Sequence, residues 1–402
     1  MTLAAQEHPT STSLDWAAAR LLAYTLATPG PAEVVPLAEA AGRTLAAPLA
    51  AVVPLPGFDN AAMDGYAVRG PAPWRVAGRI LAGHAVLPEP LADGAAVEIA
   101  TGAPVPPGTD RVVPYEDAGR DGDRVWGADG PRRHIRWQGE YARPGQQLLP
   151  AGAIVTPPVL GLAASVGLDA VAACPRPRVR LLVSGSELVV SGPPPWGRVR
   201  DAIGPMLVPL LTSWGADLPA TRMVDDDADE FADAVAACAG DAELTVVCGA
   251  SSVGPADGLH RALDRLGAVV HVDGVACRPG HPQVLARHGE GWIVGLPGNP
   301  YAALVAAFTL VEPLLAGLAG RAPATPVRAP LVEPVPPDAR RTRILPVRRA
   351  GDGFRPVGGG QPGYLGGAAG ADGFAVLPPG PVAGPVEILR LPWPTATADP
   401  WQ

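Results

Sequence analysis

The stretch PLPGFDNAAMDGYAV, residues 54–68, places acids and an amide directly after a cluster of turn-forming residues. Pro54 and Pro56 fix φ and withhold backbone donors, while Gly57 permits conformations that are closed to other residues. We therefore predict a shaped loop that leads into Asp64. Loops of this kind hold binding and catalytic groups more often than cores do, so this loop is the first candidate for chemistry.

Further segments place glycines, hydroxyls and acids where predicted apolar strands end. They are residues 184–187, 248–257 and 295–300. In an α/β domain the ligand usually sits outside the carboxyl ends of the parallel strands. We therefore expect these segments to border a binding site.

Residues 249–257, GASSVGPAD, offer backbone N–H groups and the hydroxyls of Ser251 and Ser252 just before a predicted helix. This arrangement suits phosphate binding at a helix N-terminus. An ordinary glycine-rich turn, capped by Ser252 or Asp257, explains the segment about equally well. Both interpretations stay open.

Residues 296–300, LPGNP, form a proline-flanked loop whose backbone could press against a flat ligand. The same residues suit the start of a helix, with Asn299 as N-cap and Pro300 at the first helical position. For Asn299 in isolation the helix start is the better interpretation.

Residues 225–227 are three aspartates that follow a predicted strand end, and two more acids open the next helix. Acids are favoured in a first helical turn by the macrodipole, which explains most of them. Asp226 would nevertheless share one edge of the sheet with Glu187 and Asp257. That grouping suits Mg²⁺, which binds a few carboxylates together with substrate phosphate.

Thr101 stands beside Gly102, directly after a predicted strand at residues 96–99. A hydroxyl in this place can bond a ligand oxygen, and it can equally cap the turn.

Composition excludes several classes of function. The net charge of -8 and the pI near 5.4 argue against nucleic acid as the main partner and favour a small ligand. The 4 cysteines are widely separated and the histidines show no metal-ligand spacing, which disfavours a zinc site and a disulfide framework. No Walker loop, G-x-S-x-G elbow or dinucleotide fingerprint is present.

No targeting signal is recognisable at the N-terminus, which lacks both a basic and an apolar region. The longest apolar helical stretch, near residues 301–319, is expected to be broken by Glu312 and Pro313. We therefore expect a cytoplasmic protein without a membrane span.

Several domains are expected in 402 residues. A helix is predicted over residues 14–28, with Thr12 or Ser13 as its cap and with an apolar side formed by Leu14, Ala18, Leu21, Leu22 and Leu26. Short β-like runs follow from residue 50 to about 140. Apolar strands then alternate with helices, which predicts a parallel, three-layer α/β domain over residues 176–320, before a small β domain at the end of the chain.

Ordered motifs along the chain resemble those of a known family. They are FDNAAMDGYAV, ATGAPVPPGTDRVV, QGE, VSGSELV, RPGHP and GLPGNP. In this order they resemble the molybdopterin molybdenumtransferases, the molybdenum insertases of molybdenum cofactor synthesis, over nearly the whole chain.

The resemblance implies an α/β multidomain fold whose domains can be assigned to this sequence. A discontinuous N-terminal or linker domain would comprise residues 1–50 and 141–175, with a β-rich lobe inserted at 51–140. A three-layer α/β molybdopterin-binding domain would span 176–322, and a small β-barrel domain 323–402.

The resemblance also implies an activity. A member would hydrolyse adenylylated molybdopterin at its phosphoanhydride, insert molybdenum from molybdate into the dithiolene and release AMP, with the assistance of Mg²⁺. It would be a homodimer in which the β lobe of one subunit faces the α/β domain of the other. Its protein partners would be the molybdopterin adenylyltransferase and acceptor molybdenum enzymes.

Roles for individual residues follow from the same resemblance. The catalytic residues would be Asp64, Thr101, Glu187, Asp226 and Asp257, and Mg²⁺ would bind to Asp226, Asp257 and Glu187. The substrate would bind to Ser184, Gly185, Gly249, Ser251, Ser252, Gly254, Arg278, Pro297, Gly298, Asn299 and Pro300. Asp64 and Thr101 would act across the dimer interface.

Some positions depart from the family pattern. Ser186 and Tyr141 stand where an acid is expected, and His281 stands where a lysine is expected. Arg278 preserves a positive charge in a chain that has no lysine, and Pro362 and Gly363 replace a serine-histidine pair. These departures keep an alternative open, a non-catalytic molybdopterin-binding paralogue that stores, delivers or senses the cofactor.

Overall fold

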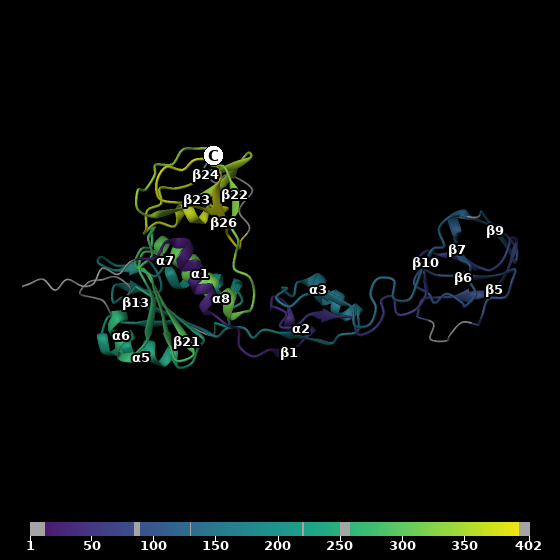
Figure 1. Ribbon diagram of the computed structural model, residues 1–402, viewed down its shortest axis with the longest axis horizontal. Coiled ribbons are helices and arrows are strands. Elements are labelled where there is room, and N and C mark those ends of the chain that lie inside the picture. Colours follow the sequence, from purple (N-terminus) through teal and green to yellow (C-terminus); the bar gives the residue numbers. More distant parts are fainter. Residues whose placement is uncertain (1–12, 84–88, 129, 219–220, 250–257, 394–402) are drawn as a thin grey trace, which may run out of the picture. The chain divides into compact units, whose positions relative to one another are not determined.

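The computed structural model describes residues 13–83, 89–128, 130–218, 221–249 and 258–393. The chain divides into two compact units (Figure 1). One comprises residues 1–33 and 174–402, and the other residues 34–173.

A six-stranded sheet forms the centre of the 174–402 unit, in the order β16-β13-β17-β21-β20-β18. Its strands are β13 (Val179–Ser184), β16 (Thr221–Val224), β17 (Leu244–Cys248), β18 (Val269–Asp273), β20 (Val284–His288) and β21 (Gly291–Leu296). The first four strands in the sheet order are parallel, which confirms the predicted α/β class. The prediction of a fully parallel sheet is wrong, because β20 runs antiparallel to both neighbours. Its two-residue connection to β21 is too short for a parallel crossover.

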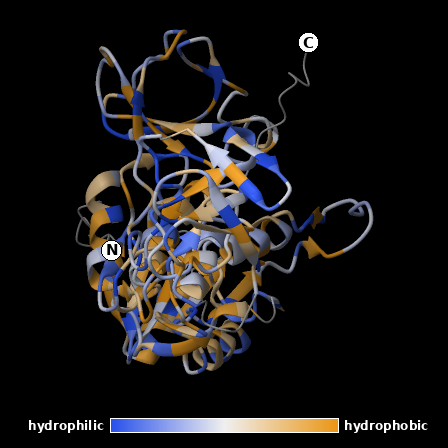
Figure 2. Cartoon of the chain, turned by 90° about the vertical axis from the view of Figure 1, so that its right-hand side faces the viewer, coloured by the Kyte–Doolittle hydropathy of each residue, from blue (hydrophilic) through white to orange (hydrophobic). Residues whose placement is uncertain are grey.

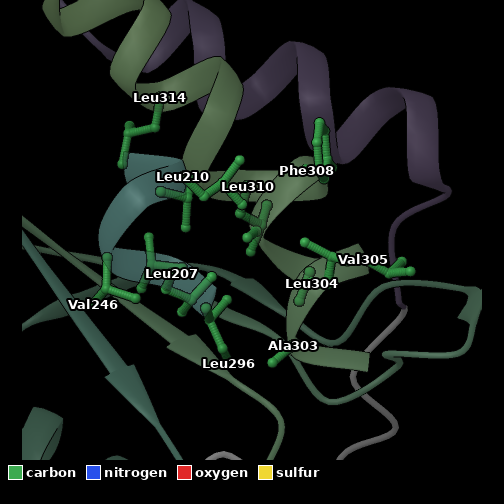
Figure 3. Packing of buried hydrophobic residues seen from close by; sticks show 14 of the residues in the cluster. Leu207, Leu210, Val246, Leu296, Ala303, Leu304, Val305, Phe308, Leu310 and Leu314 are labelled. Atoms are coloured by element: carbon green, nitrogen blue, oxygen red, sulfur yellow. The ribbon is translucent and has the colours of Figure 1, made fainter. Parts of the chain in front are cut away.

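Helices cover both faces of this sheet, because successive side chains on its strands point to opposite faces. Leu181 and Val183 pack with α1 (Trp16–Leu26), α4 (Ile203–Ser213), α7 (Pro300–Ala306) and α8 (Glu312–Leu318). Leu182 packs with α5 (Ala228–Ala239) and α6 (Gly258–Leu266) on the other face. Figure 3 shows Leu207 and Leu210 of α4 between sheet and helix residues of the first cluster. The result is the predicted three-layer arrangement.

The apolar stretch at residues 300–318 is one continuous helical run, so the predicted break at Glu312 and Pro313 is wrong. A π-helical segment, η2 (Ala307–Val311), lies just before Pro313. Its i→i+5 hydrogen bonds shift the hydrogen-bonding pattern of the helix near the point where proline has no N–H to donate. By length and hydropathy Pro300–Leu318 is able to cross a membrane, but it is completely buried in the protein. Figure 2 shows hydrophobic residues along the strands and helices of the chain.

Helix α1 begins and packs differently from the prediction. Its N-cap is Asp15, whose side chain accepts from the Ala18 N–H, and not Ser13; Thr12 lies outside the described residues. Its buried residues are Trp16, Ala19, Arg20 and Ala23, whereas Leu21 of the predicted apolar side is 63% exposed. Small alanines allow α1 to pack closely on α8. This helix therefore lies in the unit of the α/β sheet, although the predicted domain boundary at residue 50 placed it with the linker.

A second sheet of this unit lies in the C-terminal part of the chain. Its order is β19-β23-β25-β26-β22, with β24 paired to β23. The strands are β19 (Cys277–Arg278), β22 (Val327–Ala329), β23 (Thr342–Ala350), β24 (Gly353–Pro356), β25 (Gly373–Leu377) and β26 (Val386–Arg390), and α9 (Gly366–Ala369) precedes β25. Strand β19 comes from the α/β part of the sequence, so the two parts share hydrogen bonds.

The 34–173 unit contains a small helical part and a β lobe. Strand β1 (Glu33–Pro36) pairs with β12 (Ala170–Ala173), and β2 (Leu49–Ala50) with β11 (Gln147–Leu149), beside α2 (Leu37–Ala40) and α3 (Pro157–Ser165). The lobe sheet has the order β7-β4-β6-β5-β9-β8. Its strands are β4 (Gly65–Val68), β5 (Trp74–Ile80), β6 (Ala95–Ile99), β7 (Arg111–Pro114), β8 (Ala118–Asp121) and β9 (Arg124–Gly127), with η1 (Tyr115–Asp117) after β7 and β3 (Asn60–Ala61) paired to β10 (Ile135–Arg136).

Candidate functional site

A cleft of about 670 Å³ opens at the carboxyl ends of β13, β17 and β21. Its lining includes several residues predicted from the sequence, namely Ser184, Glu187, Gly249, Pro297, Gly298, Asn299 and Pro300. The location agrees with the rule that ligands of α/β sheets bind beyond the strand ends. Tertiary structure thus brings segments 184–187, 249 and 297–300 to one place.

Asp226 is fixed to the end of β13 by two serines. The Ser184 hydroxyl donates to Asp226 Oδ1 at 3.2 Å, and the Ser186 N–H donates to Asp226 Oδ2 at 3.0 Å. The Asp226 N–H in turn donates to Ser186 Oγ at 3.2 Å. Ser186 thus holds the neighbouring aspartate in place, next to the cleft residue Ser184.

Glu187 folds back over Gly185, which has a φ of +150°. A Cβ atom at Gly185 would lie 2.7 Å from Glu187 Oε2, so this approach needs a glycine. Gly185 does not line the cleft and borders a neighbouring hollow of about 520 Å³ with Asp225 and Glu230. The glycine at position 185 therefore leaves the space that the Glu187 carboxylate occupies.

Gly249 and Gly298 bring two strand ends into contact. Gly249 has a φ of +101°, and a Cβ atom there would lie 2.3 Å from the Ser184 carbonyl oxygen. A Cβ atom at Gly298 would lie 3.5 Å from Gly249 Cα. The cleft wall at this place is therefore backbone, which a ligand can approach closely.

Asn299 is the N-cap of α7 and Pro300 its first residue, which confirms the helix-start interpretation. The Asn299 side chain makes no capping hydrogen bond. Instead, the Pro362 carbonyl accepts from the Tyr301 and Ala302 N–H groups at 2.9 and 3.2 Å. The C-terminal segment thus caps the N-terminus of α7, and Gly363 lines the cleft.

Cys248 also lines the cleft, at the end of β17. Burial raises the pKa of its thiol far above the usual range. The thiol therefore stays protonated near neutral pH and is no nucleophile.

Three described residues of the 174–402 unit that were predicted at the site, Gly185, Asp226 and Arg278, do not line the cleft, and neither does His281, which stands where the family has a lysine. The Arg278 guanidinium lies 4.0 Å from Asp338, beside the pairing of β19 with β23. His281 Nδ1 donates to the Val275 carbonyl at 2.8 Å and closes its own loop. Ser251, Ser252, Gly254 and Asp257 lie outside the described residues, so the phosphate and capping interpretations of that segment stay predictions.

Two charged residues of the cleft were missed from the sequence, Arg200 and Asp201. Asp201 Oδ1 accepts from the N–H groups of Ile203 and Gly204 at 2.9 and 3.0 Å, at the start of α4. An aspartate before an apolar helical run is an N-cap signature, so Asp201 was detectable. Arg200 carries no such signal.

The 34–173 unit holds its own pair of predicted residues. The Thr101 N–H donates to Asp64 Oδ1 at 2.6 Å. This backbone hydrogen bond lowers the pKa of Asp64 below its usual range. Asp64 and Thr101 are thus neighbours, whereas Tyr141 of the same unit is 56% exposed and its backbone N–H donates to the Leu55 carbonyl at 2.9 Å.

A polar cluster beside this pair was also missed. Tyr115 Oη and Arg79 each donate to Glu98 at 2.7 Å, and the Tyr115 N–H donates to the Asp64 carbonyl at 3.2 Å. The Arg79 and Tyr115 hydrogen bonds lower the pKa of Glu98. Through the Tyr115 hydrogen bond, Glu98 of β6 connects its strand to Tyr115, which directly follows β7.

Within the described residues, no group of three or more His, Cys, Asp or Glu side chains is arranged to hold a metal ion. Of the predicted magnesium ligands, Glu187 lines the cleft, Asp226 is bonded to the cleft residue Ser184, and Asp257 is outside the described part. The all-oxygen donor set of Glu187 and Asp226 has the chemistry that Mg²⁺ prefers.

An α/β domain with a cleft at its strand ends, joined to a β lobe and a C-terminal β sheet, defines a multidomain protein that binds a small molecule. Family models match in the same order. Residues 12–167 match the MoeA N-terminal region (domain I and II), 180–317 the probable molybdopterin binding domain, and 328–383 the MoeA C-terminal region (domain IV).

Individual relatives agree with these matches. A molybdopterin molybdenumtransferase of Synechococcus elongatus is 35% identical over 81% of this chain and 84% of its own. Molybdopterin molybdenumtransferase 2 of Mycobacterium tuberculosis is 37% identical over 70% of this chain and 74% of its own. The crystal structure of a molybdopterin biosynthesis MoeA protein of Pyrococcus horikoshii superposes with a TM-score of 0.78 at 26% identity, covering 94% of this chain and 99% of that one.

The chain belongs to the molybdopterin molybdenumtransferase family. It is thus a transferase of molybdenum cofactor biosynthesis with a molybdopterin-related substrate, and its cleft lies in the matched molybdopterin-binding region.

Proposed function

We propose that this protein is a molybdenum insertase that hydrolyses adenylylated molybdopterin, inserts molybdenum from molybdate into the dithiolene and releases AMP. The observation that carries the proposal is the cleft, where Ser184, Glu187 and the 297–300 loop meet within the matched molybdopterin-binding region. Water would attack the phosphoanhydride, and the P–O bond to the AMP phosphate would break.

The cleft residues suit this reaction. Gly249 and Gly298 present backbone against which the flat pterin can lie. The Ser184 hydroxyl is held by its hydrogen bond to Asp226, and Gly185 leaves room for the Glu187 carboxylate. Groups placed in this way can orient water and stabilise developing charge. We assign substrate binding to Ser184 and residues 297–300, and the acid-base role to Glu187 and Asp226.

Mg²⁺ belongs to the proposal as a cofactor. Glu187, Asp226 and Asp257 would hold it together with phosphate oxygens of the substrate. When bound, the ion neutralises phosphate charge and so makes the leaving group better. The chain's own part is to orient the Asp226 carboxylate through hydrogen bonds from Ser184 and Ser186.

The quaternary structure, the cellular location and the protein partners that we propose come from the family resemblance. We propose a homodimer in which Asp64 and Thr101 of one subunit act on ligand held by the α/β domain of the other. The cytoplasm is the proposed location, and the adenylyltransferase and acceptor molybdenum enzymes are the proposed partners. The domain boundaries at residues 51, 141, 176 and 323 stay a prediction.

AMP release tests the proposed reaction. Purified protein is mixed with adenylylated molybdopterin, Mg²⁺ and molybdate, and AMP and molybdenum cofactor are quantified. We expect both products from the wild type, strongly reduced AMP release from Asp226→Asn, and wild-type rates from Glu290→Gln, whose side chain is fully exposed. Binding of the substrate without AMP release would contradict the proposal and favour the storage or delivery paralogue.

Mixed dimers test the action across subunits. Asp64→Asn and Asp226→Asn are each expected to have strongly reduced activity as homodimers. When the two variants are co-expressed and the heterodimer is isolated, one complete site is restored, so activity should return in part. If the activity of the heterodimer stays equally low while wild-type subunits mixed in the same way retain activity, Asp64 does not act in trans.

A further inference from the structure

The charges of the cleft differ from the sequence prediction. Among its described lining residues, the charged side chains are Glu187, Arg200 and Asp201. Arg278, the cation predicted for substrate binding, is absent from the lining, and its guanidinium lies 4.0 Å from the Asp338 carboxylate. The positive charge that borders the cleft in this part of the chain is therefore that of Arg200.

The backbone of Arg200 is fixed on both sides. Strand β15 (Val199–Arg200) pairs in parallel with β14 (Leu188–Val189). The Val199 N–H donates to the Glu187 carbonyl at 2.9 Å, and the Asp201 N–H donates to the Val189 carbonyl at 3.0 Å. Arg200 thus stands at a defined point on the rim, although its side chain is exposed.

The next residue reinforces this placement. Asp201 Oδ1 accepts two N–H groups at the start of α4. A Cβ atom at Gly204 would lie 2.5 Å from Asp201 Oδ2, so glycine makes room for this carboxylate. Since the Asp201 carboxylate already occupies the α4 N-terminus, those amides are not available to a ligand phosphate.

A phosphorylated ligand needs a cation here. The phosphoanhydride of adenylylated molybdopterin is negatively charged, and so are Glu187 and Asp201 on the same wall. Like charges in one cleft repel, and they repel more strongly where water is excluded. A guanidinium offsets this repulsion and can bond two phosphate oxygens at once through its planar fork.

We propose that Arg200 is the residue that recognises the phosphate groups of the substrate, a role that Arg278 does not take. The inference rests on the proposed function, because it requires that the cleft binds molybdopterin. Arg278 then serves the C-terminal sheet, where Asp338 also accepts from the N–H groups of Arg340 and Arg341 at 3.0 Å.

The test compares molybdopterin with the same compound after its phosphate has been removed by a phosphatase. Binding of each to the full-length protein is measured anaerobically by equilibrium dialysis. We expect Arg200→Ala to bind molybdopterin about tenfold more weakly and the dephosphorylated compound with unchanged affinity. Arg200→Lys should recover part of the loss, and the control Arg222→Ala, an exposed arginine of β16, should bind like the wild type.

Other outcomes would overturn the assignment. Equal affinity of Arg200→Ala and wild type for molybdopterin refutes it, and so does a loss that appears in Arg278→Ala instead. Circular dichroism and thermal unfolding confirm that each variant is folded. If the wild type binds no molybdopterin, the proposed function fails together with the inference. If binding depends on Arg200 but no AMP is released, only the proposed function fails.

Discussion

The Asp64 carboxylate is stabilised by a backbone donor, the Thr101 N–H at 2.6 Å. That donor bonds the ionised form best, so the pKa of Asp64 falls below its usual range. In an unfolded chain this hydrogen bond is absent. The folded lobe therefore gains stability from Asp64 above the ordinary carboxyl pKa, and loses it as the pH falls through the lower, folded pKa.

A pH series on Asp64→Asn checks this sign. The asparagine keeps the shape of the side chain but cannot ionise. We expect the variant to unfold more easily than the wild type at pH 7, and the difference between them to shrink once the pH falls below about 4. Urea unfolding at pH 7 and pH 3 measures it, with Asp121→Asn at an exposed lobe position as control. A difference that is the same at both pH values would contradict the assignment.

Buried charges at the α1–α8 contact follow a different rule. Glu312 is 1% exposed, and its carboxylate lies 2.9 Å from Arg20 and 3.6 Å from Arg321. It also accepts from the Ala324 N–H at 3.0 Å, while Arg20 donates to the Phe308 carbonyl. Burial lowers the pKa of both arginines, and Glu312 opposes this shift. Each charge is tolerated in the interior only because the others are present.

Removal of the central acid should therefore be costly. We expect Glu312→Gln to lower the free energy of unfolding by about 3–5 kcal/mol, because two buried arginines lose their counter-charge. Urea unfolding of the full chain measures the loss. Glu290→Gln breaks an exposed pair with Arg287 and should change stability by less than about 1 kcal/mol. Similar values for the two variants would show that Glu312 is not a significant buried partner.

At the scale of elements, close approach decides which face of α1 is buried. Gly317 of α8 contacts α1, and a Cβ atom there would lie 2.6 Å from Ala27 Cβ and 2.8 Å from the Tyr24 carbonyl oxygen. The Trp16 indole donates to Thr309 Oγ1 of the adjoining η2 at 3.0 Å. The helices can meet this closely only where both present small residues, so the alanine side is buried and Leu21 faces solvent.

Paired glycine substitutions test this contact. Gly317→Ala should destabilise the protein by about 1–3 kcal/mol, because the added methyl group overpacks the helix contact. Gly161→Ala in α3, where a Cβ atom meets nothing within 4 Å, should be neutral or should stabilise by about 0.5–1 kcal/mol. Thermal unfolding of both variants measures the contrast. If Gly317→Ala is as stable as Gly161→Ala, the helices are not in close contact.

At the scale of the larger unit, the α/β part and the C-terminal part share one core. Strand β19 joins the C-terminal sheet, and Tyr301 Oη donates to the Ile344 carbonyl at 2.9 Å. Phe374 of β25 lies 6.0 Å from Tyr301 and 5.4 Å from Phe308 between ring centroids. Because these contacts are buried and cross the two parts, we expect the parts to unfold together.

Hydrogen exchange on Phe374→Ala tests this cooperativity. Truncation of this fully buried ring should cost about 3–5 kcal/mol. The amides of β21, in the α/β sheet, should lose as much protection as those of β25. Loss confined to β25, with β21 protected as in the wild type, would show that the C-terminal sheet opens independently.

The sequence by itself predicted the features that depend on local order. The α/β class, the three layers and the segments 184–187 and 297–300 were readable, because strand and helix periodicities and strand-end glycines are properties of neighbouring residues. The helix start at Asn299 was readable for the same reason. The family motifs were equally local and kept their order along the chain.

Tertiary structure alone decided the rest. The antiparallel β20, the transfer of β19 to another sheet, the buried face of α1 and the presence of Arg200 rather than Arg278 in the cleft lining each depend on residues distant in the chain. Periodicity shows that a helix has an apolar side, but close packing with the partner selects which residues are buried. In the same way, a charge in the sequence becomes part of a site only where the fold places it next to a ligand.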